Sequence, residues 1–107
     1  MRNYLVLIKL SKENGAYGKG ALARIQRDVD PTAQPAWIDS RGVGIFACTS
    51  KTAAEIWKAT VPDHLSGPER EGFSDMLVLE LGSNHSGWPE SKPIAWLNSH
   101  KVGSLAD

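Results

Sequence analysis

The sequence has little that would assign it to a specialised class of proteins. Its 107 residues contain a single cysteine, Cys48, so no disulfide can form within the chain. A lone cysteine inside an apolar segment is typical of a small buried residue, and we expect a cytoplasmic protein. The 12 basic and 12 acidic side chains cancel. The basic excess that accompanies strongly electrostatic nucleic-acid binding is therefore absent.

Long hydrophobic runs are also absent. The apolar segment Tyr4–Ile8 ends at Lys9, before it reaches the core of about 7 to 15 residues found in secretory signals. It is far shorter than the roughly 20 residues that cross a bilayer, so we expect no membrane partner. The chain length and the 41% hydrophobic composition predict one globular domain with an ordinary core.

Hydrophobic patterning predicts the order strand, helix, strand, strand, helix, strand. We expect strands at Asn3–Leu10, Ala36–Asp39, Val43–Thr49 and Asp75–Leu81, and helices at Ala21–Val29 and Lys51–Thr60, the second capped by Thr49 or Ser50. This order predicts an α+β, ferredoxin-like βαββαβ fold, in which an antiparallel sheet carries both helices on one face. Residues 1–82 are assigned to that domain, and residues 83–107 to a C-terminal extension.

Both alternate sets of strand side chains are apolar. We expect one set to face the helices, namely Leu5, Leu7, Phe46, Cys48, Leu77 and Leu79, and the other, namely Tyr4, Val6, Ile8, Val43, Ile45, Met76 and Val78, to form a second face. Because that second face is too apolar for contact with water, we expect the C-terminal extension and a second copy of the chain to cover it. The predicted homodimer interface comprises Val6, Ile8, Val43, Ile45, Trp88 and Trp96, and the extension packs on its own sheet or on the partner subunit.

The segment Arg41-Gly42-Val43-Gly44-Ile45-Phe46-Ala47-Cys48 resembles a family signature. In the RNA-recognition-motif family the third strand reads basic, glycine, aromatic, glycine, aromatic, aliphatic, any residue, aromatic. That family stacks bases on the rings at the third and fifth positions. Val43 and Ile45 stand at these positions and offer no ring, so the resemblance implies shared strand geometry without base stacking.

Most of the chain resembles the small CRISPR-associated ferredoxin-like endonuclease family, in its apolar first strand, hairpin, capped helix and last strand Asp75–Leu81. The resemblance implies dimers packed through their sheets, and a metal-dependent activity that uses an aspartate at the end of the first strand. Here that place holds Ile8-Lys9-Leu10-Ser11, which supplies no carboxylate for Mg²⁺. A nuclease would have to use Asp39, Asp75 or His85 instead.

The glycine-rich segment Lys12–Gly20 is predicted to be a turn before the first helix. Lys19 and the backbone N–H groups of Gly18 and Gly20 could bind an anion there, because a helix N-terminus favours negative charge. Basic residues elsewhere could extend such a surface along a phosphate backbone. The candidate nucleic-acid or anion-binding residues are Lys19, Arg24, Arg27 and Arg41.

Three functions remain open at this point. The leading hypothesis is a non-catalytic dimeric binding protein whose partner is a protein or a nucleic acid. The alternatives are a metal-dependent endonuclease or endoribonuclease, and a small-molecule enzyme with a pocket under the C-terminal extension lined by Trp88, Trp96 and His100. Because His64, His85 and His100 lack the spacing of metal ligands, no metal and no cofactor is expected.

Overall fold

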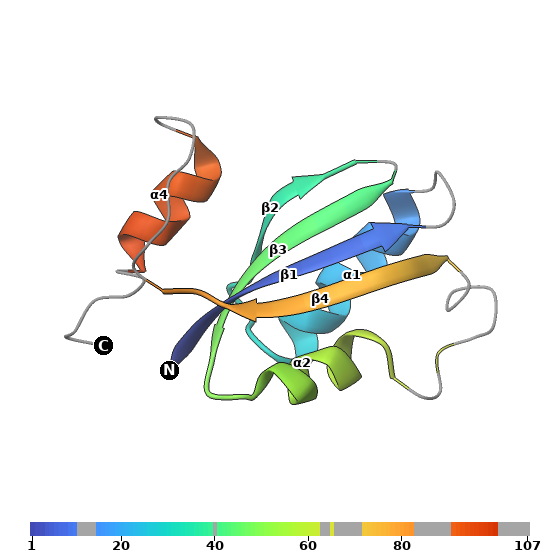
Figure 1. Cartoon of the computed structure of the whole chain (residues 1–107), viewed down its shortest axis with the longest axis horizontal. Helices are drawn as coiled ribbons and strands as arrows, with labels where there is room; N and C mark the ends of the chain where they lie inside the picture. Colours follow the sequence, from blue (N-terminus) through green and yellow to red (C-terminus); the bar gives the residue numbers. More distant parts are fainter. Residues whose placement is uncertain (11–14, 40, 63–64, 66–71, 83–90, 101–107) are drawn as a thin grey trace.

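The computed structural model describes residues 1–10, 15–39, 41–62, 65, 72–82 and 91–100. Its elements are β1 (Arg2–Leu10), α1 (Gly15–Asp28), β2 (Gln34–Ile38), β3 (Gly42–Thr49), α2 (Ala53–Thr60), β4 (Phe73–Glu80) and α4 (Lys92–Ser99) (Figure 1). None of the helices in this part of the chain is long and apolar enough to cross a membrane.

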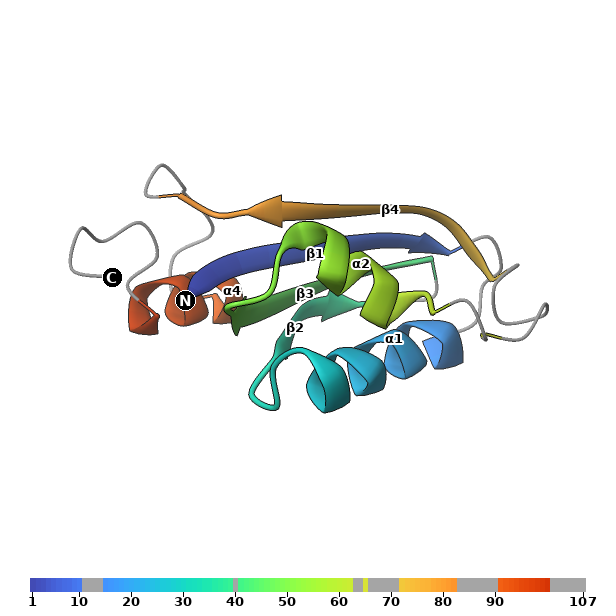
Figure 2. The same ribbon diagram turned by 90° about the horizontal axis from the view of Figure 1, so that it is seen from below.

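The four strands form one antiparallel sheet in the order β2-β3-β1-β4. Each of two helices connects strands that lie on either side of a third. Helix α1 joins β1 to β2 around β3, and α2 joins β3 to β4 around β1. Both helices cover the same face of the sheet (Figure 2). The predicted α+β class and the antiparallel sheet are confirmed.

The main core lies between this sheet face and the two helices. Val6, Ile25, Ile45 and Ile56 are completely buried there, at 0% exposure. Burial of each such side chain contributes roughly 1.5–3 kcal/mol relative to exposure. The strand residues of this core are Tyr4, Val6, Ile8, Leu10, Val43, Ile45 and Ala47.

The predicted assignment of the two faces is therefore wrong, because the set expected to lie away from the helices packs against them. Alternation alone could not choose, since both sets are apolar and a strand presents alternate residues to opposite faces. Val6, Ile8, Val43 and Ile45 are at most 3% exposed. Their burial inside the subunit contradicts the predicted role of these four residues in a homodimer interface.

Helix α4 forms a second, smaller cluster on the other face. Trp96 stacks on Phe46 of β3 with ring centroids 4.7 Å apart, and on its other side lies the His100 ring at 3.8 Å. Leu97 completes the buried part, with Leu5 among the residues packed around it. Trp96 thus packs on its own subunit, whereas Trp88 lies outside the described residues.

The helices begin elsewhere than expected. Helix α1 starts at Gly15, so much of the predicted glycine-rich turn is helical. Helix α2 is capped by Thr52, and not by Thr49 or Ser50. The Glu55 N–H donates to Thr52 Oγ1 at 3.2 Å and the Thr52 N–H donates to Glu55 Oε1 at 3.1 Å. This reciprocal pair is a capping box, which satisfies two N–H groups at the start of the helix.

Candidate functional site

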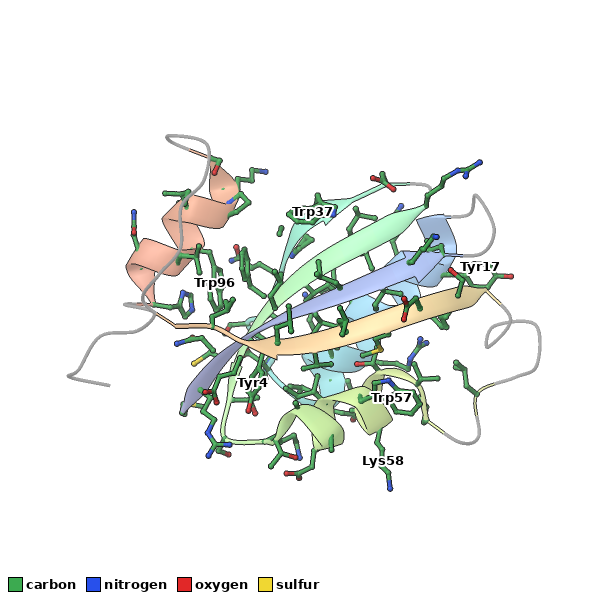
Figure 3. All side chains as sticks on the ribbon, viewed as in Figure 1. Tyr4, Tyr17, Trp37, Trp57, Lys58 and Trp96 are labelled. Atoms are coloured by element: carbon green, nitrogen blue, oxygen red, sulfur yellow. The ribbon has the colours of Figure 1, made fainter. Side chains whose placement is uncertain are left out.

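The sheet face opposite α1 and α2, here called the open face, is covered by α4 at one end only. Phe46 at that end is 4% exposed. Toward the other end Trp37 is 51% exposed and Leu77 is 55% exposed, although both are large apolar residues. Figure 3 shows that Trp37 on β2 and Trp96 on α4 lie at different places in the molecule. The exposed end of the open face is therefore the candidate binding surface.

Strand pairing places the side chains of this surface in two rows across the sheet. In the first row Trp37 is paired with Gly44, Gly44 with Leu7, and Leu7 with Leu77. In the second row Lys9 lies between Gly42 on one side and Asp75 on the other. The first row is aromatic and apolar, and the second carries opposite charges.

The turn between β2 and β3 fixes the position of a further cation. The carboxylate of Asp39 accepts hydrogen bonds from the backbone N–H groups of Arg41 and Gly42, both at 2.8 Å. The Asp39 N–H donates to the carbonyl of Gly42 at 3.0 Å. An aspartate side chain that bonds the backbone two residues later is a common way to order a turn. Arg41 is therefore held beside the two rows.

A cavity of about 220 Å³ lies on the open face between Trp37 and Asp75. Gly42, which has no side chain, is part of its lining, whereas the Trp37 ring occupies the space above Gly44. A Cβ added at Gly44 would lie 3.1 Å from Cε2 of Trp37. Six of the residues that line the cavity form what we call the open-face site, namely Leu7, Lys9, Trp37, Arg41, Asp75 and Leu77.

The open-face site combines three kinds of chemistry. The Trp37 ring offers a flat aromatic surface, Lys9 and Arg41 offer cationic donors, and the Asp75 carboxylate offers an acceptor. Lys9, Arg41 and Asp75 are all exposed, so a ligand can reach their charged groups from solvent. The site is suited to recognise a flat polar ligand that also carries negative charge.

Only one of the four predicted anion-binding residues belongs to this site, namely Arg41. The other three lie on α1, which packs on the opposite side of the sheet. Arg24 Nε donates to the carbonyl of Thr60 at 2.8 Å, and Arg27 forms an ion pair with Asp28 at 2.7 Å. Lys19 is exposed on the same helix.

The predicted anion site at Lys19 also fails for a geometric reason. Gly18 and Gly20 lie inside α1 (Gly15–Asp28). Backbone N–H groups inside an α-helix donate to the carbonyl four residues earlier, so that of Gly20 is engaged within the helix. The helix N-terminus lies several residues before them.

Sequence reasoning missed Lys9, Trp37 and Asp75 as members of one site. The available signal was the hairpin, because its turn pairs Trp37 with Gly44 and so places an aromatic ring over a residue without a side chain. The resemblance to the RNA-recognition motif pointed to Val43 and Ile45 instead. Both of these face the helices, so the exposed ring on the open face is Trp37 of β2, whereas Phe46 of β3 is covered by α4.

The residues considered for nuclease chemistry do not meet in the described part of the chain. Asp39 is engaged in the β2–β3 turn, and the Asp75 carboxylate accepts the N–H of Met76 at 2.8 Å. Among the described residues, no three His, Cys, Asp or Glu side chains lie close enough together to hold a metal ion. His64 and His85 fall outside the described residues.

The predicted pocket of a small-molecule enzyme was to be lined by Trp88, Trp96 and His100. The stacked rings of Trp96 and His100 leave no room for a ligand between them. The Trp96 carbonyl accepts a hydrogen bond from His100 Nδ1 at 2.9 Å, which fixes the imidazole in this position.

The chain matches no protein-family model, no curated protein and no solved structure. Its function is therefore inferred from the chemistry of the open-face site.

Proposed function

We propose that this protein is a non-catalytic binding protein with a ferredoxin-like fold that binds single-stranded nucleic acid on its open face. The strand order β2-β3-β1-β4 and the two helix connections around a middle strand support the ferredoxin-like assignment. In such a fold the helices occupy one face of the sheet, and the other face is available to a ligand.

The exposed ring of Trp37 is the observation that carries the proposal. It lies over Gly44 beside a cavity lined by Lys9 and Arg41. Proteins that bind single strands combine aromatic rings, on which bases stack, with cations that contact the phosphates. The open-face site holds both within one cavity.

The size and charge of the site favour a single strand over a duplex. Its volume of about 220 Å³ is below the range of roughly 300–1,000 Å³ typical of drug-sized ligands, so we expect it to take a single base at a time. The bases of a duplex are stacked and paired, and a duplex is bound mainly through its phosphates by a basic surface. The chain has no net charge, and Asp75 lies in the site as an acceptor for base amino groups.

Binding can be measured by fluorescence anisotropy with labelled DNA and RNA strands about five nucleotides long, close to the smallest site sizes of such proteins. Trp37→Ala removes the stacking ring and should weaken binding about 5- to 150-fold, since base stacking contributes about 1–3 kcal/mol. Trp57→Ala is the matched control, because Trp57 is 43% exposed but lies on α2. Its affinity should equal that of the unmodified protein.

Salt provides a second readout of the same complex. Affinity should fall as salt rises, and Lys9→Ala should reduce the slope of log K against log salt by about one. Equal losses in Trp37→Ala and Trp57→Ala would contradict the assignment of the site. Absence of binding at low salt would contradict nucleic acid as the ligand and leave a protein partner.

We also propose that the protein is a homodimer. Large apolar side chains remain exposed outside the open-face site and α4, among them Leu79 at 43% and Trp57 at 43%. Leu79 lies on the edge strand β4 and Trp57 lies on α2, which packs beside β4, so we expect the interface to form along this strand.

A further inference from the structure

The two edge strands of the sheet differ in their capacity to pair with another strand. Strand β2 has five residues, contains Pro35 and has an irregular register between Pro35 and Trp37. Proline lacks an N–H group and irregularities interrupt the ladder, so this edge is a poor template for pairing. Strand β4 has eight residues and no proline. No strand in the described part of the chain pairs with its outer edge.

The direction of the unpaired backbone groups of β4 follows from one hydrogen bond. The Leu81 N–H donates to the carbonyl of Asn3 at 2.8 Å, and this pair continues the β1–β4 register. In an antiparallel ladder, hydrogen-bonded pairs alternate with pairs that are not bonded. Leu77 and Leu79 therefore bond to β1, whereas the N–H and C=O groups of Val78 point outward from the sheet. The outward N–H of Met76 donates to the Asp75 carboxylate at 2.8 Å.

Exposed apolar side chains flank this edge on both faces of the sheet. Leu77 and Leu79 are exposed on the open face, and Trp57 of α2 is exposed on the helix side (Figure 3). Trp57 also lines a cavity of about 300 Å³ together with Val61, Phe73 and Met76. A strand added to β4 by a subunit with the same two layers would cover both exposed surfaces at once.

We propose that β4 pairs with β4 of a second copy of this chain in antiparallel orientation, about a two-fold axis that passes through Val78. This inference specifies the interface of the homodimer proposed above and does not depend on nucleic-acid binding. The axis pairs Leu77 of each copy with Leu79 of the other on the open face. It also brings the two Trp57 side chains toward each other on the helix side, as expected for an isologous contact.

The charges of β4 are compatible with this self-pairing. Directly opposed residues of an antiparallel pair lie on the same face of the sheet. Asp75 lies on the open face in register with Lys9, and Glu80 lies on the opposite face, where it forms an ion pair with Arg2 at 3.4 Å. Asp75 and Glu80 of two copies therefore cannot stand opposite each other. About the Val78 axis, Asp75 is opposed by Leu81.

The resulting assembly would have one continuous eight-stranded sheet. Both open-face sites would lie on the same face of that sheet, related by the two-fold axis. A strand long enough to reach both sites would then bind with a higher apparent affinity than a short one, because the second contact is intramolecular.

The interface can be tested by sedimentation or light scattering of the full chain, whose mass is 11.6 kDa. The unmodified protein should have twice this mass. Val78→Pro removes an outward-pointing N–H group without removing a bond to β1, and should yield a monomer. Val78→Ala is the matched control, which shortens the side chain, keeps the N–H group and should remain a dimer.

Leu79→Lys provides a second variant in case the proline at position 78 prevents folding. Its side chain is already exposed, so the fold should persist by circular dichroism while the desolvation of a lysine in the interface dissociates the dimer. A monomeric unmodified protein would overturn both the homodimer and this interface. A dimeric protein that stays dimeric in folded Leu79→Lys or Val78→Pro would overturn this interface alone. Binding of a short strand, which needs one site, should survive in every monomeric variant.

Discussion

The ring of Trp37 lies against the backbone of Gly44, so that a Cβ at position 44 would be 3.1 Å from both Cε2 and Cζ2 of the ring. Contacts this short are rare, and the ring rests on the sheet at this point because β3 has no side chain there. The ring also lines the cavity of the open-face site. Gly44 thus determines how the aromatic surface of that site lies on the sheet.

Gly44→Val should therefore weaken nucleic-acid binding while the protein stays folded. The valine side chain displaces Trp37 from the sheet, so the loss of affinity should approach that of Trp37→Ala, about 5- to 150-fold. Trp37 can move because it is half exposed and lies on an edge strand. Anisotropy titrations measure the affinity, and circular dichroism checks the fold. Unchanged affinity in a folded variant would show that the ring position is irrelevant to binding.

Trp96→Ala should destabilise the protein far more than Trp37→Ala. Trp96 is 5% exposed and stacks on Phe46 at an interplanar angle of 11°, and truncation of such a buried ring costs about 3–5 kcal/mol. Trp37 is half exposed, so its truncation should cost about 1 kcal/mol or less. Urea unfolding measures both free energies. Similar values for the two variants would contradict the packing of α4 on the sheet.

Glu55 should make stability depend on pH at the start of α2. The hydrogen bond from the Thr52 backbone N–H lowers the pKa of Glu55 from its ordinary 4.5, and the bond to the Thr52 side chain acts in the same direction. A carboxyl group whose pKa is lower in the folded state stabilises that state above the unfolded pKa. This contribution is lost as pH falls through the folded pKa.

Glu55→Gln isolates this effect, because glutamine keeps the capping hydrogen bond without the charge. The unmodified protein should be more stable than the variant at pH 7, and the difference should vanish in acid below pH 4.5. Urea unfolding at several pH values measures it. A difference that persists unchanged at the lowest pH would contradict the capping role of the carboxylate.

The sequence was sufficient to predict the order of the first six elements and the antiparallel sheet, because each strand is apolar and each helix has an amphipathic pattern or a cap. It did not predict helix α4 within the C-terminal extension. It could not predict which strand face the helices cover. Tyr4, Val6 and Ile8 are as apolar as Leu5 and Leu7, because α4 and exposed leucines make the second face apolar as well. In the structure, Tyr4, Val6 and Ile8 face the helices because they pack against Ile25 of α1 and Ile56 of α2.

The open-face site depends in part on long-range pairing that no local pattern reveals. Lys9 and Asp75 are neighbours only because β1 and β4 pair in one register. The Trp37–Gly44 pair is local, because it continues the Ile38–Val43 register set by the β2–β3 turn. The sequence alone indicated Arg41 as an anion-binding residue, but it grouped Arg41 with Lys19, Arg24 and Arg27, which lie on α1. Of these, Arg24 is bonded to Thr60 and Arg27 to Asp28 on the far side of the sheet.

The most direct test of the proposed function uses the indole N–H signals of ¹⁵N-labelled protein, assigned by tryptophan-to-phenylalanine variants, during titration with a short single strand. Trp37 lies in the open-face site, whereas Trp57 lies on α2 and Trp96 is buried under α4. Binding on the open face predicts a large, saturable shift of the Trp37 signal with small changes at Trp57 and Trp96. A saturable shift confined to Trp57, or no shift at Trp37 while the strand is bound, would contradict it.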